Sequence, residues 1–186
     1  MQRIVVRYGL IAGALMALMF LVTMQFHDRI GFGTAALVVG YTTMVLAFLL
    51  VYFGVRSYRD EVAGGTIGFL RAFGVGLLIS LVATLVYVVA WELLYFNVYP
   101  DYMERYAAYT LEQARLAGAT AEELAAQATE MRRFQEMYRN PLIVAAFTFL
   151  EPLPVALVMS LVSAAMLRRG GRARDRDVPA AARTAS

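Results

Sequence analysis

Hydrophobic residues in this chain gather in four long runs, separated by two short polar segments and one longer one. A helix rises about 1.5 Å per residue, so each run is long enough to cross a hydrocarbon core of about 30 Å. Lipid offers the backbone no hydrogen-bond partners, and runs of this kind are therefore expected to be helical. The pattern predicts membrane-spanning helices over residues 4–26, 31–55, 72–96 and 142–167.

The longer polar segment lies between the third and fourth spans and predicts a helical hairpin over residues 101–139. Gly118 is a natural end for the first helix, because glycine adopts the left-handed conformation that often follows a helix. Thr120 and Glu123 have the spacing of a capping box, which begins a second helix. The predicted fold is therefore an all-α bundle of four transmembrane helices with a hairpin inserted between spans 3 and 4.

Small residues recur every four positions on two of the predicted spans. Gly9 and Gly13 form such a pair in the first span, and Gly76, Ser80 and Thr84 form a longer series in the third. Small side chains at this spacing allow helix backbones to approach closely in a membrane. We expect both stripes to be helix-packing faces.

The arginines indicate how the spans are oriented. An N-terminus in the cytoplasm would place on that side most arginines outside the hairpin, whereas the opposite short loop holds only Arg29. Positive residues favour the cytoplasmic side of short loops. The sequence thus predicts that both termini are cytoplasmic, that the hairpin is extracytoplasmic, and that residues 168–186 form a disordered basic tail. The cytoplasmic arginines would be Arg3, Arg7, Arg56, Arg59, Arg71 and the six of the tail.

Composition supports a single membrane domain over residues 1–167. Of the 186 residues, 60% are hydrophobic and 17% charged, with a mean hydropathy of +0.59, which is too apolar for an ordinary soluble domain. Without cysteine, neither disulfides nor thiolate metal sites are available. The net charge of +3 comes from the tail and the cytoplasmic loops, so it reflects topology and does not indicate nucleic-acid binding.

The fourth span contains a costly interruption. Glu151 is followed by Pro152 and Pro154 in a run that is otherwise uncharged from Asn140 to Leu167. A carboxylate in mid-membrane costs about 3 kcal/mol on insertion scales. Each proline also lacks an amide donor and frees the carbonyl four residues earlier. A segment with these features is expected to be surrounded by other helices that share its polar groups.

Counting from the inner arginines places polar residues of all four spans in the outer half of the membrane. Glu92 lies about 31 Å from Arg71, and Glu151 about 26 Å from Arg168, at 1.5 Å per residue. Both carboxylates would then share a pocket roofed by the hairpin, and would share a proton there. Polar neighbours complete the candidate site, which comprises Glu151, Glu92, Thr148, Tyr95, Tyr41 and Thr42.

The same residues allow a second interpretation, in which Glu92 joins an interfacial aromatic belt with Trp91 and Tyr95, and Glu151 serves helix packing. The tyrosines that continue from Tyr95 into the hairpin are interpreted as interface anchors, with an aromatic ligand surface as the alternative. His27 and Asp28 fall in a short loop, where a single histidine does not predict a metal site. No cofactor is predicted.

Several segments of the chain together form a recognisable pattern, namely residues 40–50, 54–60, the Gly64-Gly65 turn, Trp91-Glu92 and residues 149–155. With this pattern the chain resembles the bacterial membrane proteins known as the domain of unknown function 4199 family. The resemblance covers nearly the whole chain before the tail and implies a four-helix protein of the bacterial inner membrane. It implies no activity and no ligand residues.

Three functional hypotheses follow. In the first, Glu151 and Glu92 bind a proton, a cation or a small solute for transport or sensing, with a second copy or a membrane protein as partner. In the second, the protein is a structural or accessory subunit whose hairpin docks a partner outside the membrane. The third, an enzyme, is disfavoured because no nucleophile–base pair is visible.

Overall fold

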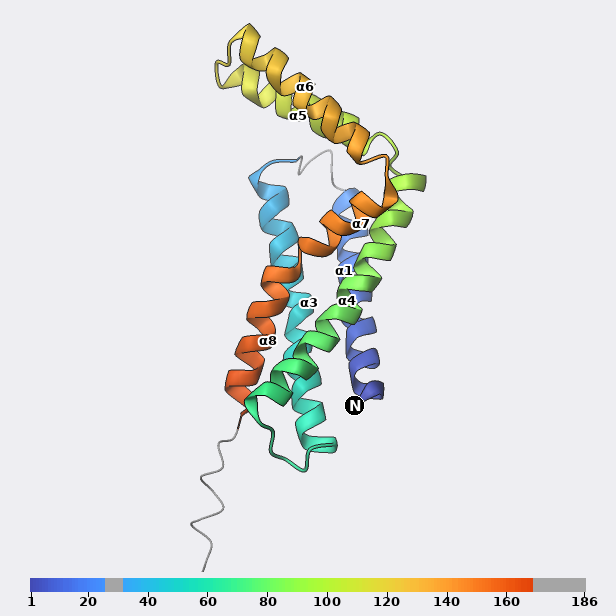
Figure 1. Ribbon diagram of the computed structural model, residues 1–186, viewed down its shortest axis with the longest axis vertical. Helices are drawn as coiled ribbons and strands as arrows, with labels where there is room; N and C mark the ends of the chain where they lie inside the picture. Colours follow the sequence, from blue (N-terminus) through green and yellow to red (C-terminus); the bar gives the residue numbers. More distant parts are fainter. Residues whose placement is uncertain (26–31, 169–186) are drawn as a thin grey trace, which may run out of the picture.

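The computed structural model describes residues 1–25 and 32–168, and the secondary structure of this part is entirely helical. The predicted basic tail, His27 and Asp28 lie outside the described residues. Figure 1 shows the helices in sequence order, which are α1 (Gln2–Gln25), α3 (Thr34–Glu61), α4 (Phe69–Asn97), α5 (Tyr102–Leu116), α6 (Ala121–Met137), α7 (Pro141–Leu150) and α8 (Leu153–Leu167).

Four stretches of the described chain are long and apolar enough to cross a membrane, namely Gln2–Met24, Thr34–Glu61, Phe69–Asn97 and Pro141–Leu167. They match the four predicted spans in number and order, although α3 and α4 each begin or end several residues from the predicted boundary. Large apolar side chains such as Leu18, Val38 and Leu93 are exposed on their outer surfaces. An apolar exterior of this kind is what lipid solvates.

Helix α4 is the centre of the bundle, because it contacts α1, α3, α7 and α8. At the α1–α4 contact, a Cβ atom added to Gly9 or Gly13 would lie only 2.6 Å from the Cβ of Val82 or Val86. At the α4–α8 contact, a Cβ on Gly76 would lie 3.1 Å from that of Ser160. Both predicted small-residue stripes are thus confirmed as packing faces.

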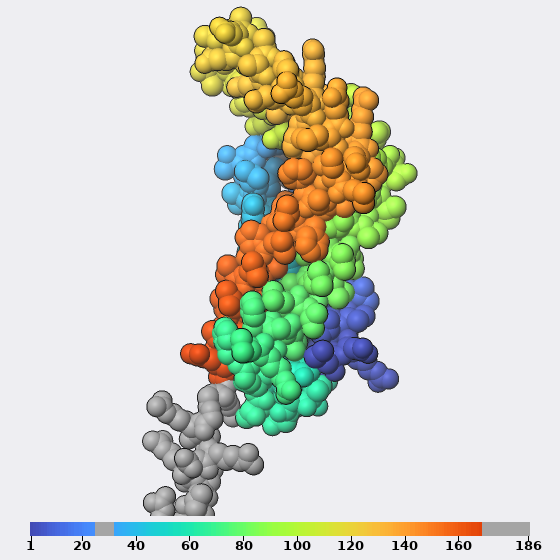
Figure 2. Space-filling model, in the orientation of Figure 1, coloured from blue at the N-terminus to red at the C-terminus, as the bar shows by residue number. Residues whose placement is uncertain are grey.

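The hairpin forms as the local sequence predicts. Gly118 has φ +87° after α5, and the Thr120 side chain accepts a hydrogen bond from the Glu123 amide. The Glu123 carboxylate in turn accepts one from the Thr120 amide at 2.7 Å, which completes the capping box. The hairpin lies at the end of the bundle opposite to both the N-terminus and the end of α8, and its tip projects away from the spans (Figures 1 and 2).

A small aromatic cluster connects the base of the hairpin to the bundle. Trp91 and Tyr95 of α4 pack with Met103 of α5 and Val144 of α7, and all four are buried. The Trp91 and Tyr102 rings meet edge to face with centroids 5.1 Å apart. Aromatic pairs in this geometry stabilise a contact beyond the area they bury. The hairpin is therefore anchored over the end of the bundle.

Candidate functional site

The fourth span is broken at Glu151. Helix α7 ends at Leu150 and α8 begins at Leu153, and the two run in different directions (Figure 1). Pro152 occupies the N-cap position of α8, and Pro154 falls in its first turn, where a missing amide is tolerated. The prolines therefore end one helix and begin the next, as their chemistry predicts, and Glu151 sits at the junction.

Glu151 borders two adjoining cavities of 280 and 360 Å³. Both lie under the hairpin and share part of their lining, which comes from α1, α4, α5 and the junction of α7 and α8. Five residues line both cavities, namely Phe20, Tyr87, Tyr102, Tyr106 and Glu151. The helix break thus presents its carboxyl group to a hollow between the bundle and the hairpin base.

Aromatic side chains dominate the common wall. Phe20 of α1 packs edge to face on Trp91 and Tyr87 of α4, with centroid distances of 4.8 and 6.2 Å. Phe32 meets Tyr102 and Tyr106 of α5 at 5.3 and 5.5 Å. Because the contacting rings come from segments far apart in the sequence, this wall is formed by the tertiary structure.

Glu151 is the only charged side chain among the described residues that line these cavities. The hydroxyl of Tyr87 lies within hydrogen-bonding reach of its carboxyl group. Thr148 is buried, and its hydroxyl donates to the Val144 carbonyl at 2.8 Å. Glu151 itself is exposed at the helix break, where it borders both cavities. The carboxyl group is therefore reachable by a ligand and has no positively charged neighbour in this lining.

The hairpin side of the cavity is also electrostatically coupled to Glu151. Burial raises the pKa of the Tyr102 phenol to about 12, and the nearby Glu151 charge adds to this effect. Burial, with a smaller contribution from Glu151, also raises the pKa of Tyr138. Both phenols therefore stay protonated at neutral pH and offer neutral hydroxyl groups to the site.

The sequence can be placed among known proteins. A family model described as "Protein of unknown function (DUF4199)" matches residues 7–169. This chain belongs to the DUF4199 family. No match was found among curated proteins or among solved structures. The DUF4199 match accords with the predicted resemblance, and inferences about function rest on the geometry of the site.

The structure of this DUF4199 member separates the predicted site residues into two groups. Glu151 and Thr148 line a cavity together. Glu92 lines neither cavity, and one of its carboxylate oxygens is buried without a hydrogen-bond partner. Five helical positions separate Tyr87 from Glu92, a rotation of about 140°, so α4 directs them to different sides. The two carboxylates are not brought into one pocket.

Helix rotation also explains the positions of the remaining candidates. On α3, the cavity is lined by Gly40, Thr43 and Met44, which share a face at i, i+3 and i+4. Tyr41 and Thr42 fall between these positions and are exposed elsewhere. Tyr95 is buried in the cluster with Trp91, next to Glu92 and outside both cavities.

Sequence reasoning missed Tyr87 and Phe20 as site residues. Tyr87 lies one helical turn before Trp91, so helical spacing from the aromatic belt would have found it. Phe20 lies one turn from Met16 in an apolar span, where no local signal distinguishes a cavity residue from a lipid-facing one. Its role follows only from the packing of α1 on α4.

The described residues contain no group of three or more His, Asp or Glu side chains arranged to hold a metal ion. His27 and Asp28, for which the sequence does not predict a metal site, lie outside the described part of the chain. What the arrangement does provide is one carboxyl group, neutral hydroxyls and a wall of aromatic rings. Such a site suits a proton or a singly charged cation.

Proposed function

We propose that this DUF4199 protein is a multi-pass membrane protein that reversibly binds a proton or a cation at Glu151, in transport or sensing. The observation that carries the proposal is that Glu151 is the only charged residue among the described residues lining two cavities. An ionisable residue within a membrane-spanning segment is costly and commonly marks an ion or substrate site. A bound proton or cation neutralises the carboxylate and so offsets that cost.

The geometry of the break supports exchange with the surroundings. Glu151 is exposed and borders both cavities, so a proton or cation can reach it through them without unfolding the bundle. Prolines at this position leave carbonyl groups of the preceding turn without helical donors, and such carbonyls are ligands for cations in broken transmembrane helices. The site therefore resembles the discontinuous helices on which membrane transporters commonly bind their ions.

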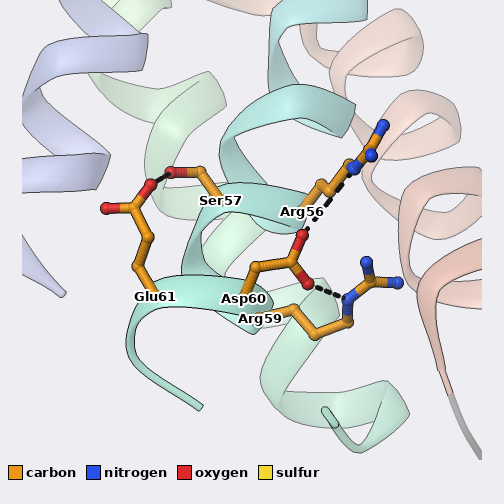
Figure 3. A network of polar contacts seen from close by, with 5 residues as sticks. All are labelled: Arg56, Ser57, Arg59, Asp60 and Glu61. Atoms are coloured by element: carbon orange, nitrogen blue, oxygen red, sulfur yellow. Dashed lines mark hydrogen bonds and ion pairs between the residues drawn. The ribbon is translucent and has the colours of Figure 1, made fainter. Parts of the chain in front are cut away.

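We place both termini in the cytoplasm and the hairpin outside, in the bacterial inner membrane. The N-terminus and the ends of α3 and α8 lie together at one end of the bundle (Figure 1). That end carries an exposed polar network on α3 (Figure 3), in which Asp60 pairs with Arg59 at 2.7 Å and with Arg56 at 3.7 Å, while Ser57 donates to Glu61. Arginine at this end supports a cytoplasmic placement.

The decisive test is a pair of matched substitutions in the full-length protein. We expect Glu151→Gln to abolish a carboxyl infrared band that responds to pH or to added cation, because the titrating group is gone. Glu92→Gln makes the same chemical change on α4, outside both cavities, and should keep that band. A Glu151→Gln spectrum that responds like the wild type would refute the proposal, provided that circular dichroism shows an intact fold.

A second candidate is an accessory subunit whose hairpin docks a partner protein outside the membrane. It is favoured by one observation, namely that α6 contains no buried residue and extends beyond the bundle (Figure 2). Replacing residues 110–130 by a short turn would remove the distal hairpin but retain the aromatic residues at its base. Unchanged partner capture by this shortened protein in a membrane pull-down would reject the docking role.

A further inference from the structure

We propose that the cation bound at Glu151 is a small organic ammonium ion, held by the carboxylate within a ring of aromatic side chains. This inference rests on the proposed function and specifies its ligand. It follows from three features of the two cavities, which are the nature of their walls, the number of their charged groups and their size.

The walls present the groups that recognise an ammonium ion. Among the aromatic residues that line the two cavities bordered by Glu151, six come from α1, α4, α5 and the residues just before α3. They are Phe20, Phe32, Tyr87, Trp91, Tyr102 and Tyr106. The face of an aromatic ring attracts a cation electrostatically, most strongly for tryptophan and when the site is shielded from water. Alkyl groups on the nitrogen would also pack favourably against the rings.

The carboxylates are too few for a divalent inorganic cation such as calcium. Calcium is held by six to eight oxygen ligands that usually include several carboxylates. The described lining provides one carboxylate. The hydroxyls of Thr23 and Thr148 are already directed at the carbonyls of Met19 and Val144, both at 2.8 Å. One negative charge beside cavities lined by aromatic rings matches one positive charge spread over an organic group.

The cavities are also of suitable size. Their volumes of 280 and 360 Å³ lie near the lower end of the range for small-molecule pockets, which begins at about 300 Å³. A bare alkali ion would leave most of this space to be filled by water against aromatic rings. An alkylated ammonium ion fills it with apolar groups and keeps its charge next to Glu151.

A direct reporter is already present, because Trp91 is the only tryptophan of the chain and lines one of the cavities. The full-length protein in uncharged maltoside micelles would be titrated with choline, and Trp91 fluorescence followed. We expect a saturable change. The uncharged isostere of choline, in which carbon replaces nitrogen, should bind at least tenfold more weakly, and equal binding of the two compounds would overturn the inference.

Two pairs of matched variants and one further control test the assigned contacts. Glu151→Gln should weaken choline binding more than tenfold, whereas Glu92→Gln should leave it within about twofold. Tyr106→Leu should weaken binding roughly five- to tenfold, while Tyr106→Phe, which keeps the ring, should not. Tyr109→Leu is the control, because Tyr109 also contacts Phe32 but lines neither cavity. Equal effects of Tyr106→Leu and Tyr109→Leu would contradict the proposed ring of aromatic contacts.

An ammonium group reaches this site either free in solution or as a lipid headgroup. Adding short-chain phosphatidylcholine to the same micelles distinguishes the two sources, because a headgroup site would bind the lipid more tightly than choline. If choline and the lipid both fail to bind while potassium or pH still changes the Glu151 infrared band, the ammonium inference is wrong and the proposed function stands. If the Glu151 infrared band responds neither to pH nor to any of these cations, the proposed function fails as well.

Discussion

A cavity built from several helices depends on how closely those helices pack, and Gly13 offers a sharp test of this dependence. Helix α1 brings Phe20 against Tyr87 and Trp91 of α4. Two turns earlier, a Cβ atom added to Gly13 would lie 2.6 Å from the Cβ of Val86 and 2.7 Å from the carbonyl oxygen of Ala83. Backbone oxygen has no alternative rotamer, so Gly13→Ala must move α1 away from α4.

The expected change in the free energy of unfolding of Gly13→Ala follows from two opposing effects. Alanine is favoured over glycine within a helix by about 0.5–1 kcal/mol, which stabilises any such variant. Overpacking a close contact costs about 1–3 kcal/mol. Gly74→Ala provides the matched control, because Gly74 is also within a span and has no atom within 4 Å of an added Cβ. The preference of a helix for alanine over glycine acts equally in both variants. The difference between their free energies of unfolding therefore isolates the cost of the clash, about 1–3 kcal/mol.

The measurement is reversible unfolding in maltoside micelles titrated with dodecyl sulfate, followed by far-ultraviolet circular dichroism. We expect the free energy of unfolding of Gly74→Ala to equal or exceed that of the wild type. That of Gly13→Ala should be lower than that of Gly74→Ala by about 1–3 kcal/mol. Gly13→Ala should also weaken choline binding, since it displaces Phe20. A Gly13→Ala variant as stable as Gly74→Ala would refute the close α1–α4 contact and with it the enclosed wall of the cavity.

Three further outcomes are expected. Replacing both Pro152 and Pro154 with alanine restores two amide donors, favours a continuous helix through Glu151, and should weaken choline binding at least tenfold in the Trp91 fluorescence titration while the fold is kept. Thr120→Ala removes the N-cap of α6 and should cost the hairpin about 1 kcal/mol, seen as faster hydrogen exchange at the start of α6. In the intact cap, hydrogen bonds from Thr120 lower the pKa of Glu123 from its ordinary 4.5, so the cap contributes fully above that pH and its contribution is lost as the pH falls. The pKa of Tyr102 is raised from 10.0 to about 12, so the folded state keeps its proton where the unfolded state has lost it. Stability should therefore decline as the pH rises from 10 towards 12, and Tyr102→Phe should make that decline smaller in alkaline unfolding measurements, while Tyr138, whose pKa is also raised, still contributes to it.

Local features of the structure were predictable from the sequence because they depend on neighbours within a turn or two. The capping box of Thr120 and Glu123 involves side chains three residues apart. Gly118 follows α5 with a positive φ that glycine adopts without strain. The four apolar spans follow in the same way from the length and composition of each segment. The break at Glu151 is a consequence of Pro152 and Pro154.

The composition of the site was predicted only in part. Glu151 and Thr148 share a helix face at i and i+3, so their association needs no knowledge of other helices. Tyr41 and Thr42 were selected by depth in the membrane, and depth is independent of rotation about the helix axis. The structure shows that α3 directs the neighbouring Thr43 into the cavity instead.

The sequence by itself determined which segments are helices, how many are apolar enough to span a membrane, and where the fourth one breaks. Each of these depends on backbone hydrogen bonds and on hydrophobicity within a single segment. Only the tertiary structure decided which side of each helix faces the others, and so placed Tyr87 and Phe20 beside Glu151 while Glu92 remained outside. Helix rotation is set by close packing between residues as distant as Gly13 and Val86, and no periodicity within one helix encodes the partner it will meet.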